Sequence, residues 1–581
     1  MSERPGPRQR PCGAWVPHGT RLLQGALLLL AALGTAAAPA RAQETSVLLP
    51  ADTAESLVAF FNRPETIRLT GASRVGPGTE LVGDVAVLGG PLTLDGTVRG
   101  RLVVINGDLE LGPDALVTGA VTVVGGDIRG LEVARVAGPV TRYRQTLSFR
   151  YDDAGLAYLP PEEEPLLAAG SDFAFGHVDL LVGIRGSYNR TEGFPVALGP
   201  RVRFGGSNLT EVQALALYRS TSGLSIDGGS LGWDVAVEQY LGAGGTVRFG
   251  LGLHSEIVPI PGADLSDREA SLATFVLHRD YRDHYEREGW RAWLAASRPG
   301  LPHTARLEYR RERHATVAAH DPFALQKNDA AWRPEPVVAE GRLRSLGASY
   351  GYDTRNDADD PSAGWLIDLG VEVGLAGDLQ RPPGPLDAPA EQRFRFPGDE
   401  SSYHAGLVDL RSYTRFNPYS RLAARLMAAG SLDGEPLPPQ RQRSLGGEGS
   451  LPGYELFDFD CGARGAAVLI ADATHFPAVG CDRVVLMQLE YQASFPMARR
   501  LVRSLNLPSG LGRSVRWAAF FGAGRAWSEQ AGADGRTRGS PDFSADAGLG
   551  LRIGRIGLYW AVPISGRGQG LNFFVRLRPR L

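Results

Sequence analysis

Alternating polar and apolar side chains over residues 170–581 constrain the fold more than any other feature of this chain. The pattern is clearest over 485–495, where Met487 and its alternate neighbours are apolar, while Glu490 and its alternate neighbours are polar. Successive side chains of a β-strand point to opposite faces, so these segments predict amphipathic strands. A soluble β-sandwich alternates too, but charged residues recur at the positions expected to face inward, as in 306–313, which favours a barrel with a polar lumen.

The chain has no candidate transmembrane helix after its first 43 residues, because no later stretch holds about 18 or more consecutive apolar residues. A polypeptide without such helices can still cross a bilayer as a closed barrel, in which every backbone N–H and C=O group is paired. Residues 170–581 are long enough for roughly 16 tilted strands with their connections. We therefore predict an all-β fold with a transmembrane antiparallel β-barrel of about 16 strands over this region.

Residues 1–42 have the composition of a signal peptide. Arginines lie before an apolar run at 22–38, and Ala40, Arg41 and Ala42 fit a cleavage site with small residues at alternate positions. The mature chain is then expected to begin near Gln43, in an exported protein. The alternative is an uncleaved N-terminal membrane anchor.

Residues 66–142 contain an internal repeat of short β-branched runs bounded by Gly, Asn or Asp. The repeated segments are 81–90, 98–108 and 117–127, which share glycines at 83, 100 and 119. One such unit cannot bury its own apolar face but stacked units can, so the repeat predicts a small β-solenoid before the barrel. Its repeat length and Gly-Asp turns resemble the bactofilin-type β-helix, which implies scaffolding or docking; a small β-sandwich is the alternative.

Two short regions flank the predicted solenoid. Residues 43–65 precede it, and 53–62 could form an amphipathic helix with Thr53 as its cap. Residues 143–169 follow it and are acidic and proline-rich, which is typical of a linker.

Residues 444–455 read S-L-G-G-E-G-S-L-P-G-Y-E, and this glycine content rules out a regular strand. The segment resembles the inward-folded long loop of the bacterial surface antigen and outer-membrane assembly factor superfamily, which includes barrels of the BAM, TAM and two-partner-secretion types. The family signature there is L-G-G-x-x-S-V-R-G-Y/F. The matching positions of this chain are Gly446, Gly447, Ser450, Leu451, Pro452, Gly453 and Tyr454.

Further segments resemble the same superfamily, in the same order along the chain. Residues 188–194 (Y-N-R-T-E-G-F) resemble its first hairpin in some branches, and 547–563 carry the spacing of its last strands. A strand-loop-strand signature is matched by Asp353, Arg355, Pro361 and Gly364. The strand that faces the inward loop is matched by Phe520, Gly522, Gly524 and Arg525. Pairing of the final strand is expected to end near Leu577, because Pro579 has no N–H to donate.

The chain departs from the family at two linked positions. In the family, a loop arginine pairs with an aspartate of the facing strand, whereas here these positions are Pro452 and Gly522. Loss of both partners avoids leaving an unpaired buried charge. We expect the loop to remain folded inward, held by packing and by a bridge between Cys461 and Cys481. Arg525 with either Glu448 or Glu455 is a candidate replacement for the ion pair, and the alternative is a loop that is no longer held.

Two cysteines, Cys461 and Cys481, remain after the predicted cleavage and both follow the glycine-rich motif. An even pair in an oxidising compartment predicts a disulfide, with two free thiols as the alternative. A bridge that closes a loop of this size stabilises the fold by about 3 kcal/mol in the chain-entropy model.

The resemblance implies protein insertion or translocation at the outer membrane, with the N-terminal domain in the periplasm. The expected partners are outer-membrane lipid and exported or outer-membrane client proteins, and the barrel is expected to be monomeric. Residues 43–150 do not have the β-α-α-β-β pattern of POTRA modules, so a plugged or narrow channel, or a structural surface barrel without translocase activity, is the alternative. A net charge of -3 gives no indication of a nucleic-acid partner.

No motif of an enzyme, cofactor site or metal site occurs in the sequence, so we expect none of the three. An outer-membrane enzyme built from distant residues is a further alternative without a motif to support it. Acidic residues gather in one loop, at Asp353, Asp357, Asp359 and Asp360. Their spacing differs from the EF-hand pattern, so a solvated acidic loop is favoured over a hard-cation site.

Overall fold

The computed structural model describes most of the chain after residue 44. The described residues are 45–46, 49–147, 149–152, 155–158, 166–173, 176–205, 208–222, 231–242, 246–262, 265–297, 301–326, 331–380, 402–417, 419–456, 458–459, 461, 468–470, 473–475, 480–494, 515–528, 538–539, 542–554, 556–565 and 570–581. The predicted signal peptide, residues 1–42, and part of the predicted linker lie outside these ranges.

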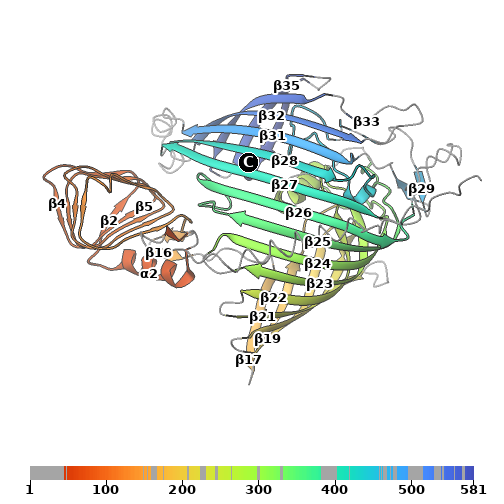
Figure 1. Cartoon of the computed structure of the whole chain (residues 1–581), viewed down its shortest axis with the longest axis horizontal. Helices are drawn as coiled ribbons and strands as arrows, with labels where there is room; N and C mark the ends of the chain where they lie inside the picture. The colour runs from red at the N-terminus through yellow and green to blue at the C-terminus, as the bar shows by residue number, and fades with distance from the viewer. Residues whose placement is uncertain are drawn as a thin grey trace, which may run out of the picture. The chain divides into compact units, whose positions relative to one another are not determined.

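The N-terminal domain is a β-solenoid with three parallel sheets, as Figure 1 shows. The first sheet contains β1 (Thr45–Ser46), β2 (Ile67–Thr70), β5 (Val85–Leu88), β8 (Leu102–Ile105), β11 (Val121–Val124) and β14 (Val140–Tyr143). The second contains β4 (Glu80–Val82), β7 (Thr97–Arg99), β10 (Leu116–Val117) and β13 (Arg135–Val136), and the third contains β3 (Ser73–Val75), β6 (Leu92–Leu94), β9 (Leu109–Leu111) and β12 (Ile128–Arg129). Parallel pairing of each strand with its counterpart in the next coil confirms the solenoid and excludes an antiparallel sandwich.

The repeated glycines allow the coils to stack. A Cβ atom on Gly100 would lie 2.3 Å from the carbonyl oxygen of Gly83, and one on Gly119 would lie 2.5 Å from that of Gly100. Any side chain at these corners would push the coils apart. Valine and leucine side chains such as Val85, Leu102 and Val121 fill the interior and are fully buried.

A helix and a hairpin cover one flank of the solenoid. Helix α2 (Ala51–Asn62) packs on the first sheet, and hairpin β15 (Phe149–Asp152) and β16 (Gly155–Tyr158) adjoins it through hydrogen bonds between Asn62 and the backbone of Leu156. The predicted helix is present but begins two residues earlier, after Pro50, so Thr53 is not its cap. Part of the predicted linker is therefore folded, because the apolar side chain of Leu156 is buried with the helix.

The second domain is one antiparallel sheet of 18 strands that curves into a barrel (Figure 1). Its strands are β17 (Leu166–Phe173), β18 (Gly176–Ile184), β19 (Pro195–Phe204), β20 (Thr210–Arg219), β21 (Leu231–Leu241), β22 (Val247–Pro259), β23 (His284–Ser297), β24 (His303–Ala315), β25 (Gly341–Asp353), β26 (Gly364–Gly377), β27 (Tyr403–Asn417), β28 (Ser420–Ser431), β31 (Arg483–Ser494), β32 (Val515–Ser528), β33 (Arg538–Gly539), β34 (Ser544–Ile553), β35 (Ile556–Pro563) and β36 (Asn572–Arg576). Apart from β17, at the edge, and the two-residue β33, sixteen strands remain, as predicted.

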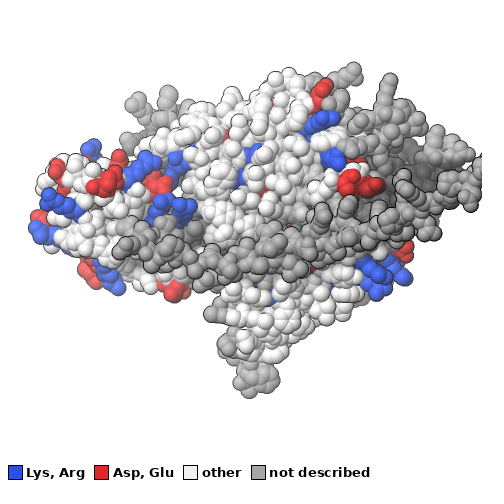
Figure 2. Space-filling model, in the orientation of Figure 1, with Lys and Arg blue, Asp and Glu red and all other residues white. Residues whose placement is uncertain are grey.

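The two faces of the barrel wall differ in polarity. On β31, Met487 and Leu489 on the outer face are 39% and 37% exposed, whereas Gln488 and Glu490 on the inner face are 0% and 1% exposed. Uncharged residues also dominate the outer surface of the barrel that is visible in Figure 2. This is the apolar exterior and polar interior that the alternation predicted. Among the described residues, no helix has the length and apolarity needed to cross a bilayer.

Four connections at one end of the barrel send residues into its interior. They are 185–194, 260–283, 316–340 and 432–482, which follow β18, β22, β24 and β28. The second contains helix α3 (Asp267–Leu277), and the last, which we call the long loop, contains the glycine-rich motif and a short 3-10 helix, η3 (Pro439–Arg441). The opposite end holds short turns, such as those between β19 and β20 and between β21 and β22.

Candidate functional site: the long loop inside the barrel

The glycine-rich motif of the long loop is folded into the barrel. Leu451, Gly453 and Tyr454 are buried, and Leu451 packs with Leu486 and Ala526 of the barrel wall. Gly447 has a φ of 75°, a left-handed conformation that glycine adopts without strain and that lets the loop reverse direction. Packing of apolar side chains is therefore the first force that holds the loop inside.

A hydrogen bond to an aspartate of the barrel wall is the second interaction that holds the loop inside. The backbone N–H of Gly453 donates to Oδ2 of Asp546, at 2.8 Å. Asp546 lies on β34, directly opposite Gly522 of β32 in the antiparallel register. A Cβ on Gly522 would lie 2.6 Å from Oδ1 of Asp546 and 2.9 Å from Cδ2 of Leu451. The carboxylate expected at position 522 is thus supplied from the next strand, and glycine at 522 leaves room for it.

Backbone carbonyl groups of the motif are also bound by the wall. Amide or guanidinium groups from three side chains donate to them: Gln488 to Ser450 at 2.6 Å, Asn572 to Pro452 at 2.7 Å, and Arg576 to Glu448 at 3.1 Å. Tyr454 in turn donates its hydroxyl to the carbonyl of Ala545, at 3.0 Å. The motif is consequently attached to β31, β34 and the last strand, β36.

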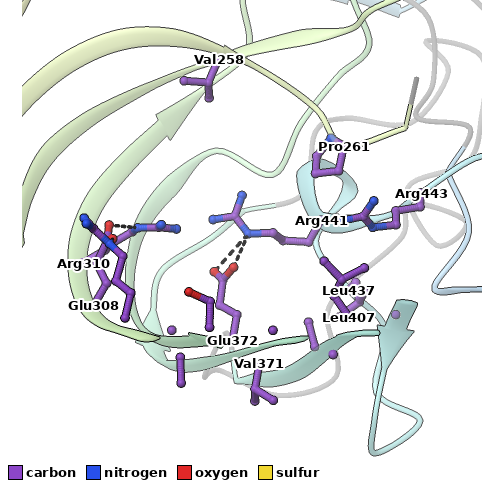
Figure 3. A pocket seen from close by; sticks show the side chains of 18 of the residues that line it. Val258, Pro261, Glu308, Arg310, Val371, Glu372, Leu407, Leu437, Arg441 and Arg443 are labelled. Carbon is purple, nitrogen blue, oxygen red and sulfur yellow. Dashed lines mark hydrogen bonds and ion pairs between the residues drawn. The ribbon is translucent and has the colours of Figure 1, made fainter. Parts of the chain in front are cut away.

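A charge pair holds the long loop at a second place. Nε of Arg441, in η3, lies 3.0 Å from both carboxylate oxygens of Glu372 on β26, and its Nη1 donates to the hydroxyl of Tyr285, at 2.7 Å. Figure 3 shows Arg441 reaching across a cavity of about 590 Å³, with Glu308 and Arg310 on the opposite wall. This pair could not be predicted from the sequence, because Arg441 precedes the recognisable motif and no pattern connects it with Glu372.

The predicted role of Arg525 is wrong. Arg525 lies on the outer face of β32, whereas Phe520, Gly522 and Gly524 alternate with it on the inner face. Its guanidinium carbon is 4.8 Å from the ring centroid of Trp527, a neighbour on the same outer face. Side chains of a strand alternate between its two faces, so Arg525, one position after Gly524, points to the opposite face.

Neither acidic residue proposed as its partner occupies that role. Oε1 of Glu448 accepts a hydrogen bond from the hydroxyl of Tyr281, at 3.0 Å. Glu455 is exposed. The family's ion pair is therefore replaced by the contacts of Asp546 and Arg441 described above.

Cys461 and Cys481 form a disulfide, with their Cα atoms 5.0 Å apart. The backbone of Cys481 also pairs with that of Arg443, through hydrogen bonds of 2.7 and 3.1 Å. These contacts connect the two arms of the long loop on either side of the motif.

The strand-loop motif forms a compact turn between β25 and β26. Asp353 accepts two hydrogen bonds from the guanidinium group of Arg355, at 3.0 and 2.7 Å. Gly364 has a φ of 106°, and a Cβ there would lie 2.1 Å from the carbonyl oxygen of Thr354. The carbonyl of Pro361 accepts from Arg421 on β28, at 2.9 Å.

The acidic residues of this turn make ion pairs and hydrogen bonds within the barrel domain. Asp360 pairs with Arg421, Arg516 and Arg552, which lie on three different strands. Asp357 accepts hydrogen bonds from the backbone of residues 359 and 360. The favoured picture of a wholly solvated loop is therefore wrong for Asp360, because three arginines of the lumen attract it. Within the described part of the chain, no group of three or more His, Cys, Asp or Glu residues is placed to hold a metal ion.

The connection 185–194 is buried around one arginine. The side chain of Arg190 is fully buried and pairs with Asp283 and Glu335, each at 2.9 Å, and with Asp280 at 3.3 Å. These carboxylates come from two other connections that enter the barrel. A buried arginine with several carboxylates is costly to separate, so the three connections form one body inside the lumen.

Helix α3 contacts both the last strand of the barrel and the connection 185–194. Glu269 pairs with Arg576 at 2.9 Å and accepts from the backbone of Leu577 at 2.8 Å. On its other side, the hydroxyl of Ser271 accepts from the backbone of Tyr188, at 2.9 Å. A capping box at Ser266 and Glu269 fixes the start of the helix. The helix thereby links the connection after β18 with the end of β36.

Comparison with known proteins finds a family similarity in the barrel domain. Residues 311–572 match the Omp85 superfamily domain. No curated protein matches the chain.

Three solved structures resemble it. BamA from Haemophilus ducreyi lacking POTRA domains 1–3 is 15% identical, with a TM-score of 0.41 over 71% of this chain and 75% of that chain. CdiB from Acinetobacter baumannii is 11% identical, with a TM-score of 0.29 over 69% of this chain and 60% of that chain. CdiB from Escherichia coli is 14% identical, with a TM-score of 0.29 over 74% of this chain and 67% of that chain. The match therefore spans less than two thirds of the Acinetobacter protein.

The order of the motifs, the inward long loop and the match over 311–572 agree with one another. Within the C-terminal domain, residues 311–572 therefore resemble the Omp85 superfamily domain both in sequence and in their arrangement as an antiparallel β-barrel.

Proposed function

We propose that this barrel inserts client proteins into the outer membrane or translocates them across it. The observation that carries the proposal is the attachment of the long loop to β34 and β36 through Asp546, Asn572 and Arg576. A loop that only blocked a pore would not need to be attached to the strands at the end of the sheet. Attachment to the last strand couples movement of the loop to the edge of the sheet.

That edge offers a chemical reason for handling proteins. Within the described residues, no ladder joins β36 to β17 or β18, so both ends of the sheet are edge strands. An edge strand presents unpaired N–H and C=O groups, and an extended peptide can satisfy them by adding a strand. In lipid such groups are costly when unpaired, which favours capture of a client strand.

The same proposal assigns the environment of each domain. Outer-membrane barrels have short turns on the periplasmic side and long loops outside. We therefore assign the end with the short turns, such as those between β19 and β20, to the periplasm, together with the solenoid. We propose that the solenoid docks exported proteins and that the outer face of the barrel contacts lipid. We also propose that the barrel is a monomer.

Photo-crosslinking in cells tests the proposal. A photoreactive residue in place of Val575, on the outer face of β36, is expected to crosslink to outer-membrane or exported proteins. The matched control is Leu549, which is also exposed on the outer face but lies on β34, between two paired neighbours. Protein adducts at Val575 alone support the proposal, whereas adducts to lipid alone at both positions contradict it.

A narrow or sealed barrel without translocase activity is the second candidate. It is favoured by the connections around Arg190, which fill the interior with paired charges. Swelling of liposomes that contain the purified protein distinguishes an open lumen from a sealed one, because sugars enter only through an open lumen. If the barrel is sealed and Val575 captures no protein, this second function replaces the first.

A further inference from the structure

After β36 the chain turns back into the barrel, at Arg580 and Leu581. Strand β36 ends at Arg576, and Pro579, which has no N–H, cannot continue its ladder. The next two side chains turn to the interior, where Arg580 is 5% exposed and Leu581 is 7% exposed. Arg578 remains outside this site, with 52% of its side chain exposed.

Arg580 lies among inward-facing residues of β31 and β32. Its Nε is 3.4 Å from Oε2 of Glu490, and both side chains are almost completely buried. Its guanidinium carbon is 4.2 Å from the ring centroid of Phe520, in the motif strand that faces the long loop. A carboxylate and an aromatic face together favour a cation, so the site selects arginine both by charge and by stacking.

Leu581 occupies a separate apolar position. It packs with Tyr413 of β27 and Ala423 of β28, which are direct partners across the strand pair. Two adjacent residues of the tail are therefore recognised in different ways. Glu490 and Phe520 select the cation, and Tyr413 and Ala423 select the aliphatic side chain that follows it.

We propose that the inner wall of the barrel carries a binding site for an Arg-Leu segment, which residues 580–581 of this chain, its tail, fill. We call it the tail site, made of Tyr413, Ala423, Glu490 and Phe520. A buried carboxylate needs a cation, so the tail completes the wall by bringing Arg580 to Glu490. The tail site is independent of client handling, because it concerns only this chain's own terminus.

The manner in which Arg580 is held makes the tail exchangeable. Among the described residues, the guanidinium nitrogens of Arg580 have the Glu490 ion pair and the Phe520 ring contact but no hydrogen bond to a protein acceptor. Arg441, by contrast, is fixed to Glu372 by hydrogen bonds to both carboxylate oxygens. A peptide with the same Arg-Leu end can therefore compete with the tail.

Thiol labelling of the full-length chain tests the inference. Cys461 and Cys481 form a disulfide, so Leu581→Cys in a Cys12→Ser background adds a single free thiol among the described residues. We expect this thiol to react with a water-soluble maleimide at least about tenfold more slowly than the matched Arg578→Cys thiol, because burial hinders access. Glu490→Gln, which keeps the shape and removes the charge, is expected to abolish most of that protection.

Competition by a peptide provides a second measurement on the same protein. A synthetic peptide ending in Arg-Pro-Arg-Leu should accelerate labelling of Leu581→Cys, whereas one ending in Glu-Pro-Glu-Leu should not. Heat-modifiable gel mobility shows that each variant retains a folded barrel. Equal labelling of the two positions, or acceleration by both peptides alike, overturns the tail site.

Discussion

The backbone N–H of Gly453 donates to Asp546, at 2.8 Å, and Asp546 is the cross-strand partner of Gly522. An acidic group therefore lies on the strand next to the one on which the resemblance implied it. The chain also has a backbone donor in place of a long cationic side chain, at the residue after Pro452. The loop is held inside without the family's arginine.

Asp546→Ala is expected to release the glycine-rich motif. It removes the carboxylate that accepts from Gly453, a charge-assisted bond worth about 1.5–3 kcal/mol. A cysteine at the buried Ser450 should then react roughly tenfold faster with a water-soluble maleimide. Asp546→Asn keeps an oxygen acceptor and serves as the control, so equal acceleration by both variants contradicts the hydrogen bond.

Gly522→Ala is expected to destabilise the barrel although alanine is small. Its Cβ would meet Oδ1 of Asp546 at 2.6 Å and Leu451 at 2.9 Å, so the cost should be about 1–3 kcal/mol of overpacking. Unfolding in guanidinium chloride and detergent measures it. Gly347→Ala on β25 is the matched control, because its nearest neighbours lie 3.9 Å away. A midpoint that does not change for Gly522→Ala excludes close packing at this position.

Arg441→Met should lower the free energy of unfolding more than the double substitution of Arg441→Met with Glu372→Gln does. The single substitution leaves the Glu372 carboxylate without the cation that it faces, at a cost of about 3 kcal/mol. The double substitution removes the charge as well, so part of this free energy is recovered. A double-mutant cycle from guanidinium unfolding measures the coupling, and strictly additive effects argue against a direct pair.

Replacing Cys461 and Cys481 by serine should loosen the long loop and leave the barrel wall intact. The bridge closes a loop of 20 residues, which corresponds to about 3 kcal/mol in the chain-entropy model. Limited proteolysis should then cut within 432–482 more rapidly, while cleavage of the solenoid serves as the internal control. Faster cleavage of both regions would indicate general unfolding instead.

Much of the architecture could be predicted from the sequence, because each feature repeats or alternates. The period of two in β31 identified the polar inner face, and the glycines at 83, 100 and 119 identified stacked coils. Both signals arise from local geometry. The glycine-rich motif likewise identified the long loop, since its backbone conformation requires glycine at Gly447.

The contacts that hold the loop could not be predicted in the same way. Asp546 faces Gly453 only through the register of β32 and β34, and Arg441 meets Glu372 across the lumen. Neither relation is visible in the spacing of residues along the chain. The position of Arg525, by contrast, can be predicted from the sequence, because alternation from Gly524 places it on the outer face.

Single-channel conductance of the full-length protein and of Asp546→Ala, in planar bilayers, tests the central claim most directly. If the Gly453–Asp546 hydrogen bond holds the long loop across the lumen, the unaltered protein should show low, stable conductance, and Asp546→Ala should show frequent larger openings. Asp546→Asn should resemble the unaltered protein. Equal, large conductance of all three proteins would contradict the claim that this contact keeps the loop inside.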